Sequence, residues 1–167
     1  IRIVSFLVLA ALLSFVGCGG SASDSDADTT DRPMPSAAEQ RLTIEAPWIR
    51  PAPQGAVSAM YATLVNGTTA PDTLYAVRFA GADSVEIHET QPMDDGSGMS
   101  GMREIGPLPV PPTSRVRLQP GGKHVMLMGL KEALNVGDTL TVFLNFSDTG
   151  PRQLTVPVRA TSPDDDG

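Results

Sequence analysis

The chain has 167 residues, of which 12 are Lys or Arg and 19 are Asp or Glu, so its formal net charge is −7. Nucleic-acid binding requires a basic surface, and we therefore expect no nucleic-acid partner. The single cysteine, Cys18, excludes an internal disulfide. The 15 prolines and 16 glycines favour a turn-rich β domain over a helical one.

The first residues are typical of a secretory signal peptide. One basic residue, Arg2, precedes an apolar run over residues 3–13, which is too short for a comfortable membrane span. The run closes with Phe15-Val16-Gly17-Cys18, which resembles the lipobox of bacterial lipoproteins, where the signal is cut before a cysteine that then carries lipid. We predict a signal peptide at 1–17, lipidation of Cys18 and a membrane-anchored protein in the bacterial periplasm or cell envelope. An ordinary secretory signal with an incidental cysteine is the alternative.

Composition divides the rest of the chain into three parts. Residues 18–40 are mostly Gly, Ser, Ala, Asp and Thr, which predicts a flexible acidic linker. Residues 41–160 have the length of one domain with a single core. Residues 161–167 contain Asp164, Asp165 and Asp166 and are predicted to form a disordered acidic tail.

The domain is predicted to be all-β. Alternating hydrophobic residues between turn signals such as Asn66-Gly67 and Pro120-Gly121-Gly122 predict strands over 57–65, 73–79, 85–88, 114–118, 124–128, 139–146 and 153–158. Residues 131–134 are the only helical candidate, as one brief turn. Short strands at this regular spacing predict a β-sandwich or small barrel.

Both histidines and five of the seven methionines lie within residues 88–128. Thioether sulfur is soft and neutral and suits Cu(I), and imidazole also binds copper. His124 and Met126 are two residues apart and therefore share one face of a strand. A methionine-rich core with incidental histidines is the alternative. It explains poorly the methionines of the Gly/Ser/Asp segment over residues 91–102, which we expect to be a loop.

At these residues the chain resembles the periplasmic copper chaperones of the PCuAC type. The resemblance covers nearly the whole domain, through Trp48-Ile49-Arg50, a Tyr61-to-Asn66 segment, Val85-Glu86-Ile87-His88-Glu89, Met102-Arg103 and residues 120–131. It implies a cupredoxin-like fold with Greek-key-type strands. It also implies that Met128 is a packing residue. Trp48 itself is expected to be a core or rim aromatic rather than a substrate platform.

The family motif is His, ten residues, Met, twenty-one residues and His-x-Met, which implies Cu(I) ligation by His88, Met102, His124 and Met126. Twenty-one residues separate Met102 from His124, but thirteen separate His88 from Met102, so three extra residues lie within 94–101. Met99 fits the first spacing and fails the second, and Met93 and Met99 are possible auxiliary ligands. Glu86 and Glu89 flank His88. They are candidates for orienting it, although we expect both to be solvated strand-edge residues.

Two imidazoles and two thioethers are all neutral, which suits the monovalent ion. The resemblance implies a non-enzymatic chaperone that passes Cu(I) by ligand exchange to a copper-accepting protein, such as a cytochrome c oxidase subunit or its assembly factor. The alternative is a lipid-anchored β-sandwich that binds a partner or ligand without metal. Neither a Ser/His/Asp set nor paired carboxylates are evident, so an enzyme is not expected.

Overall fold

The computed structural model describes residues 41–93 and 99–163. The predicted signal peptide at 1–17, Cys18, the linker at 18–40 and residues 164–167 of the predicted tail lie outside the described residues. Among the helices of the described ranges, none is both long enough and apolar enough to cross a membrane.

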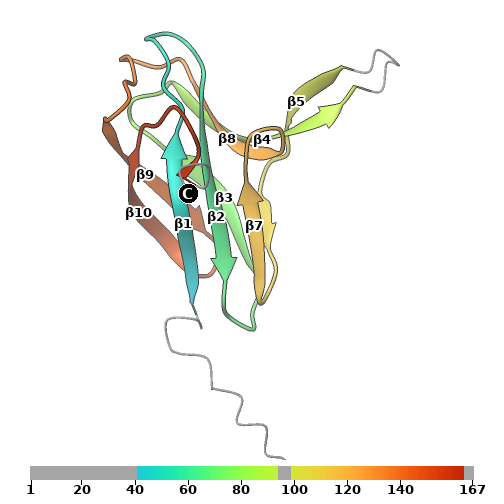
Figure 1. Ribbon diagram of the computed structural model, residues 1–167. Helices are drawn as coiled ribbons and strands as arrows, with labels where there is room; N and C mark the ends of the chain where they lie inside the picture. The colour runs from blue at the N-terminus through green and yellow to red at the C-terminus, as the bar shows by residue number, and fades with distance from the viewer. Residues whose placement is uncertain (1–40, 94–98, 164–167) are drawn as a thin grey trace, which may run out of the picture. The chain divides into compact units, whose positions relative to one another are not determined.

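Strands make up most of the described chain (Figure 1). Their bounds are β1 Leu42–Ile49, β2 Ser58–Asn66, β3 Asp72–Arg78, β4 Ser84–Pro92, β5 Ser100–Glu104, β6 Leu108–Val110, β7 Ser114–Leu118, β8 Lys123–Met128, β9 Thr139–Phe146 and β10 Gly150–Pro157. One sheet has the order β1-β2-β8-β4-β5, with β7 also paired to β2, and the other has the order β10-β9-β3-β6. All pairings between these strands are antiparallel. The predicted all-β sandwich is confirmed.

Some elements differ from the prediction. Strands β1 and β6 were not expected, and β4 and β5 extend well into the segment predicted to be a loop, because Gln91 pairs with Gly101 and Pro92 with Ser100. The predicted helical turn at 131–134 is wrong. Its last residue, Leu134, instead forms an isolated bridge with Ala52. The N–H of each residue donates to the carbonyl of the other.

The main core joins inward-facing residues of both sheets. Leu64 of β2, Val125 of β8, and Val142, Leu144 and Phe146 of β9 are buried in it. Burying each such side chain stabilises the fold by about 1.5–3 kcal/mol. Along β8, Val125 and Leu127 are buried in this core, while the residues that alternate with them, His124 and Met126, face the other way.

A buried carboxylate ties β3 to the turn between β9 and β10. Asp72 accepts hydrogen bonds from the backbone N–H groups of Thr73, Asp148 and Thr149 and from the Thr149 hydroxyl. Burial raises the pKa of Asp72, but these hydrogen bonds outweigh burial and hold its pKa below the ordinary value. The ionised carboxylate is therefore part of the fold.

A β-bulge sets the phase of β1. The pairing shifts between Glu45, which faces Thr63, and Trp48, which faces Tyr61. Residues three apart normally lie on opposite faces of a strand, but the extra residue places Glu45 and Trp48 on the same, outer face of the sheet. There Trp48 packs in a second small cluster with Tyr61 and Ala59. The outer face of this sheet thus has an apolar anchor of its own.

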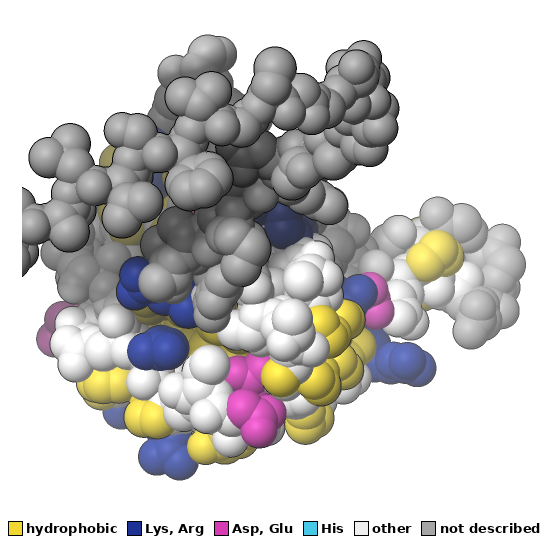
Figure 2. Space-filling model, turned by 90° about the horizontal axis from the view of Figure 1, so that it is seen from below, with side chains coloured by type: hydrophobic (Ala, Val, Ile, Leu, Met, Phe, Trp, Pro, Cys, Tyr) yellow, Lys and Arg dark blue, Asp and Glu magenta, His cyan; other side chains and the backbone are white. Residues whose placement is uncertain are grey.

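The face seen in Figure 2 carries hydrophobic side chains interspersed with single basic and acidic groups. On the described part of this face, no large area has one sign of charge.

Candidate metal centre

The two histidines lie side by side on adjacent strands. His88 of β4 is directly opposite His124 of β8, and their ring centroids are 6.1 Å apart. The same ladder places Glu86 opposite Met126. Directly opposite residues of an antiparallel pair point to the same side of the sheet. His88, His124 and Met126 therefore share the outer face.

Met102 reaches this face from the neighbouring strand β5. Its ladder partner on β4 is Thr90, two residues beyond His88, so alternation puts Met102 on the same side as the histidine. Met102, His124 and Met126 line one cavity of about 170 Å³. The register of β8, β4 and β5 thus puts all four residues predicted as copper ligands on one face, where His88 lies opposite His124 but is not among the residues that line this cavity.

The structure does not bring Met93 to this face. Gln91 and Gly101 pair on the side of the hairpin opposite to Thr90 and Met102, and the Met93 side chain lies against Gly101, where an added Cβ would be 3.2 Å from Met93 Cε. The Met93 N–H donates to the Met99 carbonyl across the hairpin at 2.7 Å. Both methionine side chains are about half exposed or more. As auxiliary ligands they stay predictions.

The hydrogen bonds of the two rings define their free lone pairs. His124 Nδ1 lies 3.0 Å from the carbonyl of Gly122, which only accepts, so Nδ1 donates and Nε2 keeps the lone pair. His88 Nε2 donates to Glu86 Oε2 at 2.9 Å, which leaves the lone pair on Nδ1. That Nδ1 atom is buried and has no partner among the described residues. A buried acceptor without a donor is costly in a protein and suits a cation.

The expectation that Glu86 is only a solvated edge residue is wrong. Its carboxylate fixes the His88 ring, as carboxylates do for metal-binding histidines. Glu89 instead accepts hydrogen bonds from Lys123 at 2.7 Å and Gln91 at 2.8 Å, which lower its pKa. The alternation of β4 predicts that Glu86 and His88 share one face, but no local pattern indicates the direct hydrogen bond between them.

One aromatic ring, that of Tyr61, lines the cavity of the centre, and Trp48 packs against it. The rings of Trp48 and Tyr61 are tilted by 38° with centroids 4.6 Å apart, and the centroid of the Tyr61 ring is 6.3 Å from that of the His124 ring. Trp48 is buried, as predicted for a core or rim aromatic. Burial raises the pKa of Tyr61, partly offset by Arg50, so the phenol stays neutral at ordinary pH and adds no charge beside the ligands.

Exposure falls from one end of the centre to the other. The Met102 residue is 61% exposed, whereas His124 is 4% exposed. One predicted ligand is thus open to solvent, while the other is buried in the fold. Further along β8, Met128 lies opposite Ser84 and is only partly buried.

The donor set is neutral and half sulfur. Within the described ranges there is no cluster of three or more His, Cys, Asp or Glu side chains suited to a metal. Zinc and calcium sites are built from such groups. Two imidazole nitrogens with two thioether sulfurs fit a soft monovalent ion better.

Solved structures similar to this chain include copper-bound domains. The chain is 29% identical to the copper-bound PCuAC domain from PmoF2, with a TM-score of 0.60 over 72% of this chain and 94% of that one. It is also 29% identical to the Cu(I) form of DR1885 from Deinococcus radiodurans, with a TM-score of 0.55 over 75% of this chain and 84% of that one. The predicted resemblance to PCuAC proteins is confirmed, and with it the cupredoxin-like fold.

Sequence comparison places the chain within this group more narrowly. The family model described as "Putative lipoprotein LpqE-like" matches residues 42–158, and the chain belongs to this LpqE-like family. One relative, "Putative lipoprotein Lxx21020" of Leifsonia xyli subsp. xyli, is 30% identical over 156 residues, which cover 91% of this chain and 86% of the relative.

Proposed function

We propose that this chain is a copper chaperone that binds one Cu(I) ion through His88, Met102, His124 and Met126. The observation that carries the proposal is the register of the outer face, which gathers both histidines and two of the methionines. The unpartnered buried Nδ1 of His88 adds a lone pair in need of a cation. The likeness to copper-bound PCuAC domains supports the choice of metal.

The gradient of exposure suits transfer by ligand exchange. An incoming ligand from an acceptor displaces the exposed Met102 first, while the buried His124 holds the ion until the new bonds have formed. Neutral ligands add no charge that would trap the ion. The protein thus carries copper and does not use it for catalysis.

The remaining parts of the proposal concern where this takes place. The lipobox at Cys18 and the lipoprotein names of the family and of its Leifsonia relative support export and a lipid anchor in the cell envelope. The acceptor we propose is the copper-site assembly of cytochrome c oxidase, through a subunit or an assembly factor. Anaerobic mixing of the loaded chain with such a copper-free acceptor domain tests this, with transfer followed by the acceptor's absorbance.

Copper binding itself is tested by competition against a chromogenic Cu(I) chelator under anaerobic conditions. We expect one ion per chain. Replacing Met126 or Met102 with leucine keeps the side-chain volume but removes the sulfur, and should weaken binding. Met128→Leu is the matched control, because Met128 lies further along β8, opposite Ser84, and does not line the cavity. No uptake by the wild-type chain, or uptake unchanged by Met126→Leu, would overturn the proposal.

The metal-free alternative makes the opposite prediction. A β-sandwich that recognises a partner without metal would show no chelator competition, and replacing His88 and His124 together would leave its binding unchanged. The same titration therefore separates the two hypotheses.

A further inference from the structure

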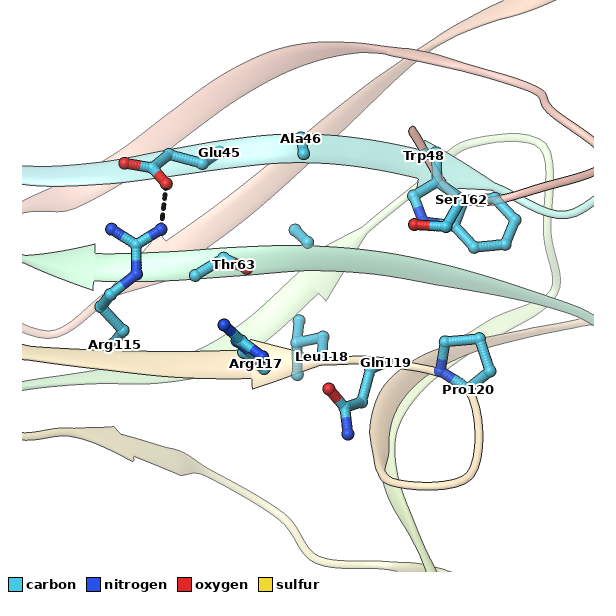
Figure 3. A pocket seen from close by; sticks show the side chains of 11 residues that line it. Glu45, Ala46, Trp48, Thr63, Arg115, Arg117, Leu118, Gln119, Pro120 and Ser162 are labelled. Carbon is cyan, nitrogen blue, oxygen red and sulfur yellow. Dashed lines mark hydrogen bonds and ion pairs between the residues drawn. The ribbon is translucent and has the colours of Figure 1, made fainter. Parts of the chain in front are cut away.

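A second cavity, of about 410 Å³, lies on the outer face of the sheet where β1, β2 and β7 run side by side (Figure 3). This volume is within the range of small-ligand sites, about 300–1,000 Å³. The residues that the argument uses are Trp48, Thr63, Arg115, Arg117, Gln119 and Pro120. None of them is a proposed copper ligand.

Strand register turns two arginines toward this cavity. Arg117 pairs with Thr63 and Arg115 pairs with Val65, so both guanidinium groups leave the sheet on the outer side. The residue after Arg117, Leu118, is opposite Ala62 and buried in the core. Figure 3 shows Arg115 at one end of the cavity beside Glu45, Trp48 near the other end and Arg117 between them.

The two arginines differ in what they contact. Arg115 Nη2 donates to Glu45 Oε2, so its charge is compensated. The Arg117 guanidinium has no hydrogen bond or ion pair with any residue in the described ranges. Arg41 and Arg152 also form no ion pair in the described ranges, but unlike them Arg117 lines a cavity. Its planar fork matches a carboxylate through two parallel hydrogen bonds.

The other walls supply amphipathic character. Trp48 and Pro120 offer apolar surface, while Thr63 and Gln119 offer a hydroxyl and an amide that can donate hydrogen bonds. A ligand that fits all of these groups has a carboxylate at one end and an apolar body at the other.

The backbone beneath the cavity is strained. Ala46, which lines it, has φ of +46° and is followed by Pro47. A positive φ is uncommon for any residue other than glycine, and a following proline disfavours helical conformations further. This strained bulge is what places Glu45 and Trp48 on one face. Such strain is found preferentially at ligand-binding sites.

We propose that this cavity is a binding site for a carboxylate joined to an apolar group, with Arg117 on the carboxylate and Trp48 and Pro120 against the apolar part. The proposal goes beyond copper binding and does not depend on it. The two sites are neighbours, because Pro120 lines both cavities and Trp48 contacts Tyr61, which lines the cavity of the candidate metal centre.

Trp48 is the only tryptophan, so its fluorescence reports on this cavity directly. We would titrate the copper-free full chain with hexanoate and with the neutral isostere hexanamide. Hexanoate should shift the emission and saturate, and hexanamide should not. Arg117→Gln should weaken hexanoate binding roughly tenfold, as expected for loss of a charged hydrogen bond. Arg117→Lys, which keeps the charge without the fork, should fall between.

Arg152→Gln is the matched control, because Arg152 is exposed on β10 of the other sheet and its loss changes the net charge equally. Hexanoate binding that is equal in Arg117→Gln and wild type, or an emission that does not respond to hexanoate at all, would refute the proposal. Copper loading of Arg117→Gln should match wild type. A failure of Cu(I) binding in every variant would remove the copper proposal and leave this one intact.

Two sources of the carboxylate are distinguished by a second pair of probes. The blocked tripeptide acetyl-Leu-Asp-Leu-amide, compared with its Asn counterpart, presents the carboxylate as a protein side chain. Tighter binding of the Asp peptide than of hexanoate assigns the cavity to an acidic side chain of a protein. The reverse order assigns it to a free small acid.

Discussion

The Glu86 carboxylate holds the His88 ring through a bond of 2.9 Å to Nε2, and its removal tests how the metal centre is organised. Glu86→Ala leaves the ring free to rotate and to exchange its tautomer, so Nδ1 no longer presents a fixed lone pair. We expect the Cu(I) affinity to fall while the fold remains intact.

The magnitude follows from the exposure of the bond. A hydrogen bond to a charged group contributes about 1.5–3 kcal/mol when it is well buried. The His88 side chain is 12% exposed, but that of Glu86 is 33% exposed, so water weakens the bond. We therefore take about 1–2 kcal/mol, which corresponds to roughly 5–30-fold weaker Cu(I) binding. This agrees with the lower part of the effect of about 10–100-fold seen when supporting groups of metal ligands are replaced.

The assay is the anaerobic chelator competition, with two further variants. Glu86→Gln keeps an acceptor oxygen and should bind Cu(I) more tightly than Glu86→Ala. Glu104→Ala removes the same charge from β5 directly opposite His88, where Glu104 is exposed. If Glu104→Ala weakens binding as much as Glu86→Ala, the effect is general electrostatics and the reasoning about the hydrogen bond is refuted.

Three further predictions concern the fold around the site. Asp72→Asn should lower the free energy of unfolding by about 1–3 kcal/mol at neutral pH. Because the pKa of Asp72 is depressed in the folded state, this difference should disappear as the pH falls below the ordinary value of 3.8. Urea denaturation of both proteins at several pH values measures it. Gly129→Ala should destabilise by more than Gly150→Ala, since both have positive φ but only at Gly129 would a Cβ lie 2.4 Å from the Asp83 carboxylate; thermal unfolding of the two variants compares them. In a chain whose other tyrosine is replaced by phenylalanine, near-ultraviolet absorbance should show Tyr61 ionising above pH 10.0, and ionisation below that pH would contradict its burial.

The strands that the sequence predicts best are those bounded by clear turns and alternating without interruption. Residues 114–118 and 139–146 form β7 and β9 with the predicted bounds. Strand β1 was missed because Ala46-Pro47 breaks its alternation. The bulge that repairs the phase exists only in pairing with β2, so no local pattern indicates it.

The same distinction applies to the site. A spacing of two is a local property and predicted that His124 and Met126 share a face. The position of Met102 depends on the register between β4 and β5. Because the hairpin contains extra residues, the spacing along the chain does not predict that register. The cavity at Arg117 is formed by three strands, two of which lie far from Arg117 in sequence. The sequence therefore predicted Arg117 only as a residue of an alternating strand and did not predict the cavity.

Strand β8 explains how a protein of this kind can load and release an ion without unfolding. Its inward residues, Val125 and Leu127, are wholly buried in the main core, and its outward residues, His124 and Met126, face the metal cavity. Stability and metal binding therefore reside on opposite faces of one strand. Structural zinc sites differ, because there the ion itself supplies the folding energy and its loss unfolds the domain. Here backbone pairing places His124 and Met126, so under the proposed function the chain would keep its fold while it accepts an ion and passes it on.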